Sequence, residues 1–171
     1  MPSKLNVSDA LKNPGQSFPF NADCEIEEME IFGDSVLLTD VTCKGTMVGG
    51  IDTVGFEGEA DATVTTRCAR CRDEIVRPLH AQVDAVYSRV PDPEDPDLYS
   101  FEAYTVDLTD AIRDALVLEL PMRFLCSEDC KGLCPKCGTN LNTGTCTCQE
   151  GVDDSNPFAA LRSIVVNNEE V

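Results

Sequence analysis

The sequence has no tryptophan, a single histidine and no long apolar run. Aromatic residues make up only 6% of its 171 residues, so we expect a modest core built from aliphatic side chains. No stretch approaches the roughly 18 consecutive apolar residues of a membrane-spanning helix. The polar start, MPSKLNVSDA, contains no apolar targeting core. The sequence therefore predicts a cytoplasmic protein whose cysteines stay reduced.

Motifs of hydrolytic enzymes are also missing. Neither G-x-S-x-G nor H-E-x-x-H occurs, and the one histidine, His80, is expected to lie on the surface. The paired cysteines lack the strand–helix context of thioredoxin-like redox enzymes. We therefore expect a protein that is not an enzyme, has no small-molecule substrate and binds no membrane.

Positive charge is scarce, because 13 lysines and arginines face 31 acidic residues and the formal net charge is −18. This balance opposes broad nonspecific binding to nucleic acid and favours a basic protein partner. The cations that are present gather around cysteine pairs. We single out Arg70, Arg72, Lys131 and Lys136 as RNA or partner contacts. The alternative is that they only balance the charge of metal-bound thiolates.

Cysteine, by contrast, is abundant, and six of the ten lie in the segment CSEDCKGLCPKCGTNLNTGTCTC. Cys134 and Cys137 form a C-x2-C knuckle followed by Gly138, which can adopt the positive φ of a tight turn. Cys146 and Cys148 follow after a polar loop. Zn²⁺ prefers four thiolates in a tetrahedron, so these four cysteines form the first predicted zinc site.

Four further cysteines form two half-sites without obvious partners, so we assign them to a second zinc ion: Cys68, Cys71, Cys126 and Cys130. This site would tie the middle of the chain to a later segment. Two alternatives stay open. One is a single six-cysteine site that exchanges ligands, with Cys68 and Cys71 left reduced. The other is a set of disulfides, which the expected compartment disfavours. Cys24 and Cys43 show no metal-ligand spacing and are expected to be buried apolar residues.

The clearest periodicity is strict alternation of apolar and polar residues. It runs through residues 54–67 and again through 75–87, on either side of Cys68 and Cys71. This pattern predicts a half-buried antiparallel hairpin with the two cysteines at its tip. Residues 36–48 predict another strand, with Leu37 and Val41 among the residues on its buried face.

One helix is predicted at residues 107–119, with Asp107 as its cap and an apolar stripe that Leu118 and Leu120 widen. The fold class is therefore α+β: an antiparallel β-sheet or partly open barrel, a few short helices and a C-terminal zinc-knuckle module. We divide the chain into a β-rich body at 1–125 that includes this helix, a zinc-binding module at 126–150, and an acidic linker with a short helix at 151–171.

Three segments together resemble a known family. They are C-A-R-C at residues 68–71, CKGLCPKCGTNLN at 130–142 and NPFAAL at 156–161. The chain resembles the YceD family, the large ribosomal RNA subunit accumulation proteins. The resemblance implies a role in synthesis, processing or stability of large-subunit ribosomal RNA, with that RNA or a pre-ribosomal protein as partner. It supplies no catalytic residues.

Two other functions stay open beside this expectation. The chain could be an acidic, zinc-stabilised adapter that binds a basic ribosomal protein or a ribonuclease. It could instead be a redox-controlled switch that releases zinc when its thiolates are oxidised.

Overall fold

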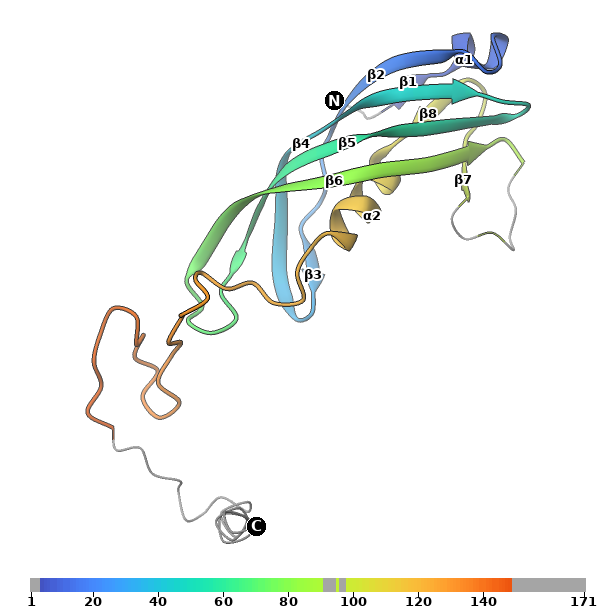
Figure 1. The fold of residues 1–171 in the computed structure, drawn as a ribbon. Helices are drawn as coiled ribbons and strands as arrows, with labels where there is room; N and C mark the ends of the chain where they lie inside the picture. Colours follow the sequence, from blue (N-terminus) through green and yellow to red (C-terminus); the bar gives the residue numbers. More distant parts are fainter. Residues whose placement is uncertain (1–3, 91–94, 96–97, 149–171) are drawn as a thin grey trace, which may run out of the picture. The chain divides into compact units, whose positions relative to one another are not determined.

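The computed structural model describes residues 4–90, 95 and 98–148 (Figure 1). The chain divides into two compact units, Met1–Cys130 and Lys131–Val171. The sequence analysis grouped residues 126–150 as one module, whereas this division keeps Cys126 and Cys130 with the β-rich unit. The helix predicted within 151–171 lies outside the described residues, as does most of the acidic, proline-rich sequence at residues 91–97.

The β-rich unit is built on an open sheet with the strand order β2-β4-β5-β6-β7 and with β3 paired to β4 at the side. Neighbouring strands are antiparallel except β6 and β7, which are parallel. Within the described residues the end strands β2 and β7 do not pair, so an open sheet forms and not a barrel. The strands are β2 (Ser17–Cys24), β3 (Met29–Ile31), β4 (Asp34–Gly49), β5 (Thr53–Arg67), β6 (Glu74–Ser88) and β7 (Leu98–Ser100).

The hairpin of β5 and β6 confirms the predicted alternation. The two strands pair without a break from Thr53 opposite Ser88 to Arg67 opposite Glu74. Every second residue of β5 faces the core, and polar residues such as glutamate, aspartate and threonine face outward. Because the register is continuous, the connecting residues 68–73 form the tip of a long two-stranded arm.

Strand β4 departs from the prediction at one point. Leu37 was expected in the core but is 38% exposed, while Val36 and Leu38 are buried. The register with β5 shifts between Thr39 and Thr42, and Asp40 has a φ of 53°. A bulge of this kind inserts an unpaired residue, so the alternation before it has the opposite phase from the alternation after it.

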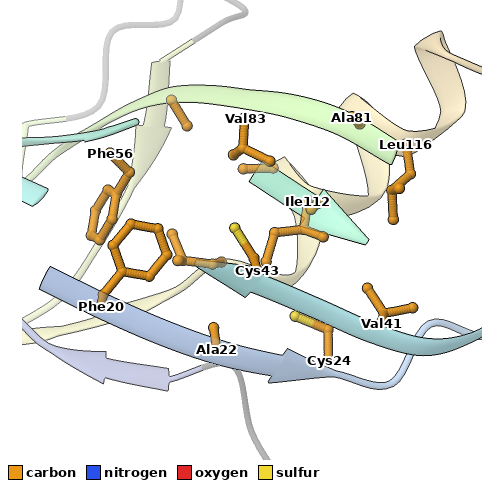
Figure 2. Packing of buried hydrophobic residues seen from close by; sticks show 14 of the residues in the cluster. Phe20, Ala22, Cys24, Val41, Cys43, Phe56, Ala81, Val83, Ile112 and Leu116 are labelled. Atoms are coloured by element: carbon orange, nitrogen blue, oxygen red, sulfur yellow. The ribbon is translucent and has the colours of Figure 1, made fainter. Parts of the chain in front are cut away.

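Helix α2 (Thr109–Leu118) packs against β5 and β6. It begins two residues after Asp107, whose carboxylate accepts a hydrogen bond from the backbone N–H of Thr109 at 3.0 Å. In Figure 2 the buried side chains of Ile112 and Leu116 lie beside residues of the sheet. The prediction for Leu118 was wrong: its side chain is 85% exposed, because it lies off the stripe that faces the sheet.

The core is one continuous apolar cluster that includes Cys24 and Cys43, as expected. Burial is the main reason that the pKa of the Cys43 thiol rises to about 11, so this cysteine stays neutral. Strands β1 (Lys4–Asn6) and β8 (Thr105–Asp107) pair as a separate antiparallel two-stranded sheet, and helix α1 (Ser8–Lys12) packs against β4. No helix among the described residues is long and apolar enough to cross a membrane.

Two glycines in neighbouring strands allow an unusually close backbone approach. Gly45 lies opposite Gly58, and a Cβ added at Gly45 would come within 2.1 Å of the carbonyl oxygen of Glu57. We expect Gly45→Ala to destabilise the chain by about 1–3 kcal/mol, because the strands must move apart. Gly55→Ala is the matched control, since a Cβ there meets nothing within 4 Å. Equal urea midpoints for the two variants would contradict this explanation.

Candidate metal centre

The first cysteine cluster begins at the tip of the β5–β6 arm. A tight turn holds Cys68 and Cys71: the N–H of Arg72 donates to the carbonyl of Cys68 at 2.9 Å, and the N–H of Cys68 donates to that of Asp73 at 2.8 Å. Arg72 has a φ of 63°, the left-handed conformation that ends such a turn. Both cysteine side chains are buried. The turn therefore places two sulfurs off the end of the sheet without disturbing its ladder.

The other half of this cluster arrives from the segment that follows α2. The N–H of Ala69 donates to the carbonyl of Phe124 at 2.8 Å, which fixes this segment beside the turn. The N–H of Cys126 then donates to the sulfur of Cys68 at 3.4 Å. The Sγ atoms of Cys68 and Cys130 are 3.8 Å apart. The structure thus joins two segments that lie more than fifty residues apart in sequence.

The arrangement of these sulfurs matches what a tetrahedral metal ion requires. All four ligand atoms lie within 4.8 Å of one another. The Sγ atoms of Cys71 and Cys126 are 3.5 Å apart. A zinc ion with bonds of about 2.3 Å to four sulfurs has sulfur–sulfur edges of about 3.8 Å. The residues present therefore fit a metal ion with four thiolate ligands.

The thiols of this cluster differ in how readily they ionise. Burial opposes ionisation of the Cys68 thiol, but three backbone N–H groups that point at its sulfur lower its pKa to about 6. The pKa values of two neighbouring thiols, Cys71 and Cys126, are raised instead. Burial, with additional contributions from the adjacent sulfurs, raises the pKa of Cys71, and contact with Cys130 raises that of Cys126. Cys68 therefore forms a thiolate more readily than Cys71 or Cys126, and a bound cation would favour the thiolate form of all three.

Arginine side chains brace the backbone around the cluster. Arg70 donates from one guanidinium nitrogen to the carbonyls of Glu128 and Cys130, at 3.2 and 2.9 Å. Arg77 of β6 donates to the carbonyls of Leu125 and Cys126, at 2.8 and 3.1 Å. Both side chains therefore hold the later ligand segment against the hairpin.

The sequence analysis assigned no role to Arg77. Arg72, one of the expected contacts, is exposed and pairs with Asp34. Arg77 lies in the same phase as Ile75 and opposite the buried Val64, so its side chain is on the core-facing side of β6, near the tip where the second ligand segment docks. No local pattern indicates its contacts, because the carbonyls that accept its hydrogen bonds are distant in sequence.

We expect Arg70→Gln to lower the metal affinity of this cluster by about tenfold, since residues that orient metal ligands typically contribute that much. Competition with a chromophoric chelator measures the change. Arg72→Gln is the control because its partner is Asp34 and not the ligand segment. The bracing role would be contradicted if both variants lost metal equally, or if neither did.

The second cluster lies within the unit Lys131–Val171 and joins Cys134, Cys137, Cys146 and Cys148. Its knuckle forms as predicted. The N–H of Gly138 donates to the carbonyl of Cys134 at 2.8 Å, and Gly138 has a φ of 72°. The four ligand atoms again lie within 4.8 Å of one another, so the C-x-C spacing is compatible with the site.

A network of asparagines shapes the loop between the two cysteine pairs of this unit. The side-chain oxygen of Asn142 accepts the N–H of Lys131 at 2.8 Å, and that of Asn140 accepts the N–H of Asn142 at 3.0 Å. Hydrogen bonds from Thr139, first its side chain and then its backbone, lower the pKa of Cys137 to about 6. Contact with Cys137 raises the pKa of Cys148 to about 12. Cys137 therefore ionises more readily than Cys148.

The predicted partner contacts belong to different units and surroundings. Arg70 and Arg72 lie on the hairpin turn, and Lys131 and Lys136 lie in the second unit, where both lysines are exposed. His80 is 73% exposed in its side chain, contacts Asp61 and belongs to neither cluster. The structure therefore gathers the eight predicted metal ligands into the two predicted quartets and leaves the histidine outside them.

Comparison with known proteins places this arrangement in a family. The family model described as large ribosomal RNA subunit accumulation protein YceD matches residues 56–165. The chain belongs to the YceD family. The matched region contains both cysteine clusters and all but the first three residues of the hairpin that carries the first one.

Relatives of this YceD-family chain occur in bacteria and plants. It is 27% identical to the uncharacterized protein YlbN of Bacillus subtilis over 139 residues, which cover 79% of this chain and 81% of the relative. A Mycobacterium bovis protein, Mb2951c, is 27% identical over 155 residues, or 82% and 71% of the two chains.

The similarity to plant proteins is more local. The chain is 47% identical to the Zea mays protein named large ribosomal RNA subunit accumulation protein YCED homolog 1, chloroplastic, over 45 residues. That stretch covers 26% of this chain and only 15% of the plant protein. No solved structure matches the chain.

Proposed function

We propose that this chain is a non-enzymatic zinc-binding factor of the cytoplasm that supports the accumulation of large-subunit ribosomal RNA. The observation that carries the proposal is the pair of four-sulfur clusters inside the region that matches the YceD model. The name of that family supplies the link to ribosomal RNA. The partner is that RNA or a protein bound to it in pre-ribosomal particles.

The donor atoms favour zinc and a structural role. Four thiolates suit Zn²⁺, and a quartet of protein ligands leaves no coordination position for water or substrate. Zinc in such a site stabilises the fold, because the metal binds only when its ligands are brought together. In the first unit it would fasten the hairpin turn to the segment that follows α2.

Contact with RNA is proposed for three cations whose side chains are exposed near the cysteine clusters. Arg72, Lys131 and Lys136 are exposed, whereas the guanidinium of Arg70 already binds carbonyls of the ligand segment. In a chain of net charge −18, these local cations would direct binding to a few phosphates. The acidic remainder of the surface would suppress binding elsewhere.

We expect the triple variant Arg72→Gln, Lys131→Gln and Lys136→Gln to bind pre-ribosomal particles more weakly. The slope of log affinity against log salt should fall by about two, because fewer counterions are released from single-stranded RNA. Co-sedimentation over a salt series measures both quantities. Arg70 stays intact so that metal binding is not disturbed.

The matched control removes three exposed lysines from the β-rich unit, at Lys4, Lys12 and Lys44. Binding that falls equally in both triple variants, or in neither, would contradict the contact assignment.

A second candidate function, a protein adapter, is favoured by the strong acidity of the chain. Recovery of a basic ribosomal protein or a ribonuclease with the chain after nuclease digestion would support the adapter over direct RNA binding.

A further inference from the structure

One stretch of the sheet edge carries backbone groups with no strand beside them. The carbonyl of Ser88, at the end of β6, accepts a hydrogen bond from the N–H of Phe101 at 3.1 Å, on the side of β7. The N–H and C=O of one strand residue point to the same side, and successive residues alternate. Strand β6 keeps an unbroken register with β5 from Ser88 back to His80. The backbone N–H and C=O groups of His80, Gln82 and Asp84, which lie in the same phase as Ser88, therefore also point away from β5.

Strand β7 covers only a short part of this edge. It pairs with β6 from Val86 to Ser88 and no further. Within the residues that the structure describes, no backbone group pairs with the outward side of β6 at residues 80–84. Pro78 lies two residues before His80 and in the same phase. Its nitrogen therefore points away from β5, and the missing N–H removes no hydrogen bond between β5 and β6. The strand therefore tolerates proline at an outward-pointing position.

A groove runs along this edge, between β6 and α2. It has a volume of about 470 Å³ and is lined on one side by Gln82 and Asp84, and on the other by Ala111, Ala115 and Leu118. Because the two alanine side chains are small, they leave space between the helix and the strand. Leu118 contributes an apolar side chain that is 85% exposed. Figure 1 shows α2 beneath β6, with β7 farther along the same strand.

The groove continues into a second hollow of about 380 Å³ that shares Gln82 and Glu119 with it. The residues that line the two hollows include five carboxylates and no lysine or arginine: Glu59, Asp61, Asp84, Asp114 and Glu119. Asp114 is paired with Arg113, and Asp61 contacts His80. Asp84 and Glu119 form no ion pair or side-chain hydrogen bond with the described part of the chain.

We propose that this groove binds an extended, lysine- or arginine-rich polypeptide segment, which adds a strand to the open edge of β6. The outward N–H and C=O groups of His80, Gln82 and Asp84 would form the ladder, a recognised mode of peptide binding. Leu118 would contact an apolar side chain of the segment, and the carboxylates would pair with its cations.

The charge of the groove selects this occupant over others. A second copy of the chain would bring the same carboxylates to the same edge, and RNA phosphates would be repelled there. An extended basic segment satisfies both the backbone groups and the charges. The proposal goes beyond the zinc-dependent function, because the groove lies on β6 and α2 and includes no cysteine.

The test uses the full chain and a fluorescently labelled peptide of alternating lysine and valine. A second peptide has the same sequence but carries methyl groups on alternate backbone nitrogens, which removes the ladder and keeps the charge. We expect methylation to weaken binding roughly tenfold, the loss expected from one or two hydrogen bonds. Equal binding of the two peptides, or no binding of the parent peptide, would overturn the proposal.

Two variants of the chain test the same contact from the other side. Gln82→Pro removes one outward N–H without touching the ladder with β5, and we expect it to weaken the parent peptide roughly tenfold. The pair Asp84→Asn and Glu119→Gln should weaken it roughly fivefold, since exposed ion pairs contribute modestly. The control pair is Asp23→Asn and Glu30→Gln, exposed acids outside the groove.

Circular dichroism establishes whether Gln82→Pro is folded. If it is not, the comparison of the two peptides on the unchanged chain decides the question alone. Losses that are equal in the two acidic pairs would mean diffuse attraction to an acidic protein and would overturn the proposal. Displacement of the peptide by single-stranded RNA from the same groove would overturn it as well.

Discussion

Replacing Cys68 with serine should leave one bound metal ion per chain in place of two and should strongly destabilise the β-rich unit. Cys68 is fully buried, and its sulfur lies next to those of Cys71 and Cys130. A serine hydroxyl cannot supply the thiolate that the ion requires. The cost is about 4 kcal/mol when free zinc exceeds its dissociation constant a thousandfold, because binding to the folded state alone provides that stabilisation.

Urea unfolding in zinc-buffered solution measures this loss, and hydrogen exchange locates it. Protection should fall first in the turn at residues 68–73 and in the segment that follows α2. Cys43→Ala is the control, because Cys43 is equally buried but lies in the apolar core away from both clusters. It should keep both ions and lose only about 1 kcal/mol. A Cys68→Ser chain that retained two ions at full stability would contradict the assignment.

Phe56→Ala should be the most damaging substitution in the core. Phe56 is fully buried, and its ring makes edge-to-face contacts with Phe20 and Tyr87 at centroid distances of 5.4 and 5.5 Å. The chain has no tryptophan and few aromatic residues, so nothing else fills this space. We expect a loss of about 3–5 kcal/mol from the cavity and the lost contacts.

Thermal unfolding followed by circular dichroism checks this expectation, with a fall in Tm of about 15 °C. Phe32→Ala is the control. Phe32 is 74% exposed in the turn before β4, so its removal should change Tm by only a few degrees. If both variants unfolded at the same temperature, Phe56 could not be a central packing residue.

The grouping of the eight cysteines into two quartets could be predicted from the sequence, because the spacing of the cysteine pairs is a strong constraint. Two unpaired half-sites, at Cys68 and Cys71 and at Cys126 and Cys130, have a simple solution if they share one ion. The structure brings those sulfurs together. The long hairpin followed from strict alternation, which one buried face imposes on both strands.

Other features depended on tertiary structure and could not be predicted in this way. The exposure of Leu37 results from a bulge near Asp40, whose effect on the alternation becomes visible only once β4 is paired with β5. Leu118 follows Ala115 by three residues, a spacing that fits an apolar stripe, yet it lies off the part of the helix surface that the sheet covers. The bracing carbonyl contacts of Arg70 and Arg77 require a segment that is distant in sequence, so no local pattern indicates them.

The groove beside β6 also depends on tertiary structure and could not be predicted from the sequence pattern. Alternation predicted that His80, Gln82 and Asp84 face outward, but it could not indicate that β7 would leave their backbone groups uncovered. That follows from the short pairing of β7, which ends at Val86. Pairing length, unlike alternation, is set by how the chain returns to the sheet after residue 88.

The most direct test of the central claim is the native mass of chain purified without chelator. We predict the polypeptide mass plus two zinc ions. The eight ligand thiols should be protected from alkylation by the metal, and the two core cysteines should be protected by their burial. Denaturation with chelator should then expose all ten thiols. A folded chain with the bare polypeptide mass, whose eight clustered thiols react freely, would contradict the account.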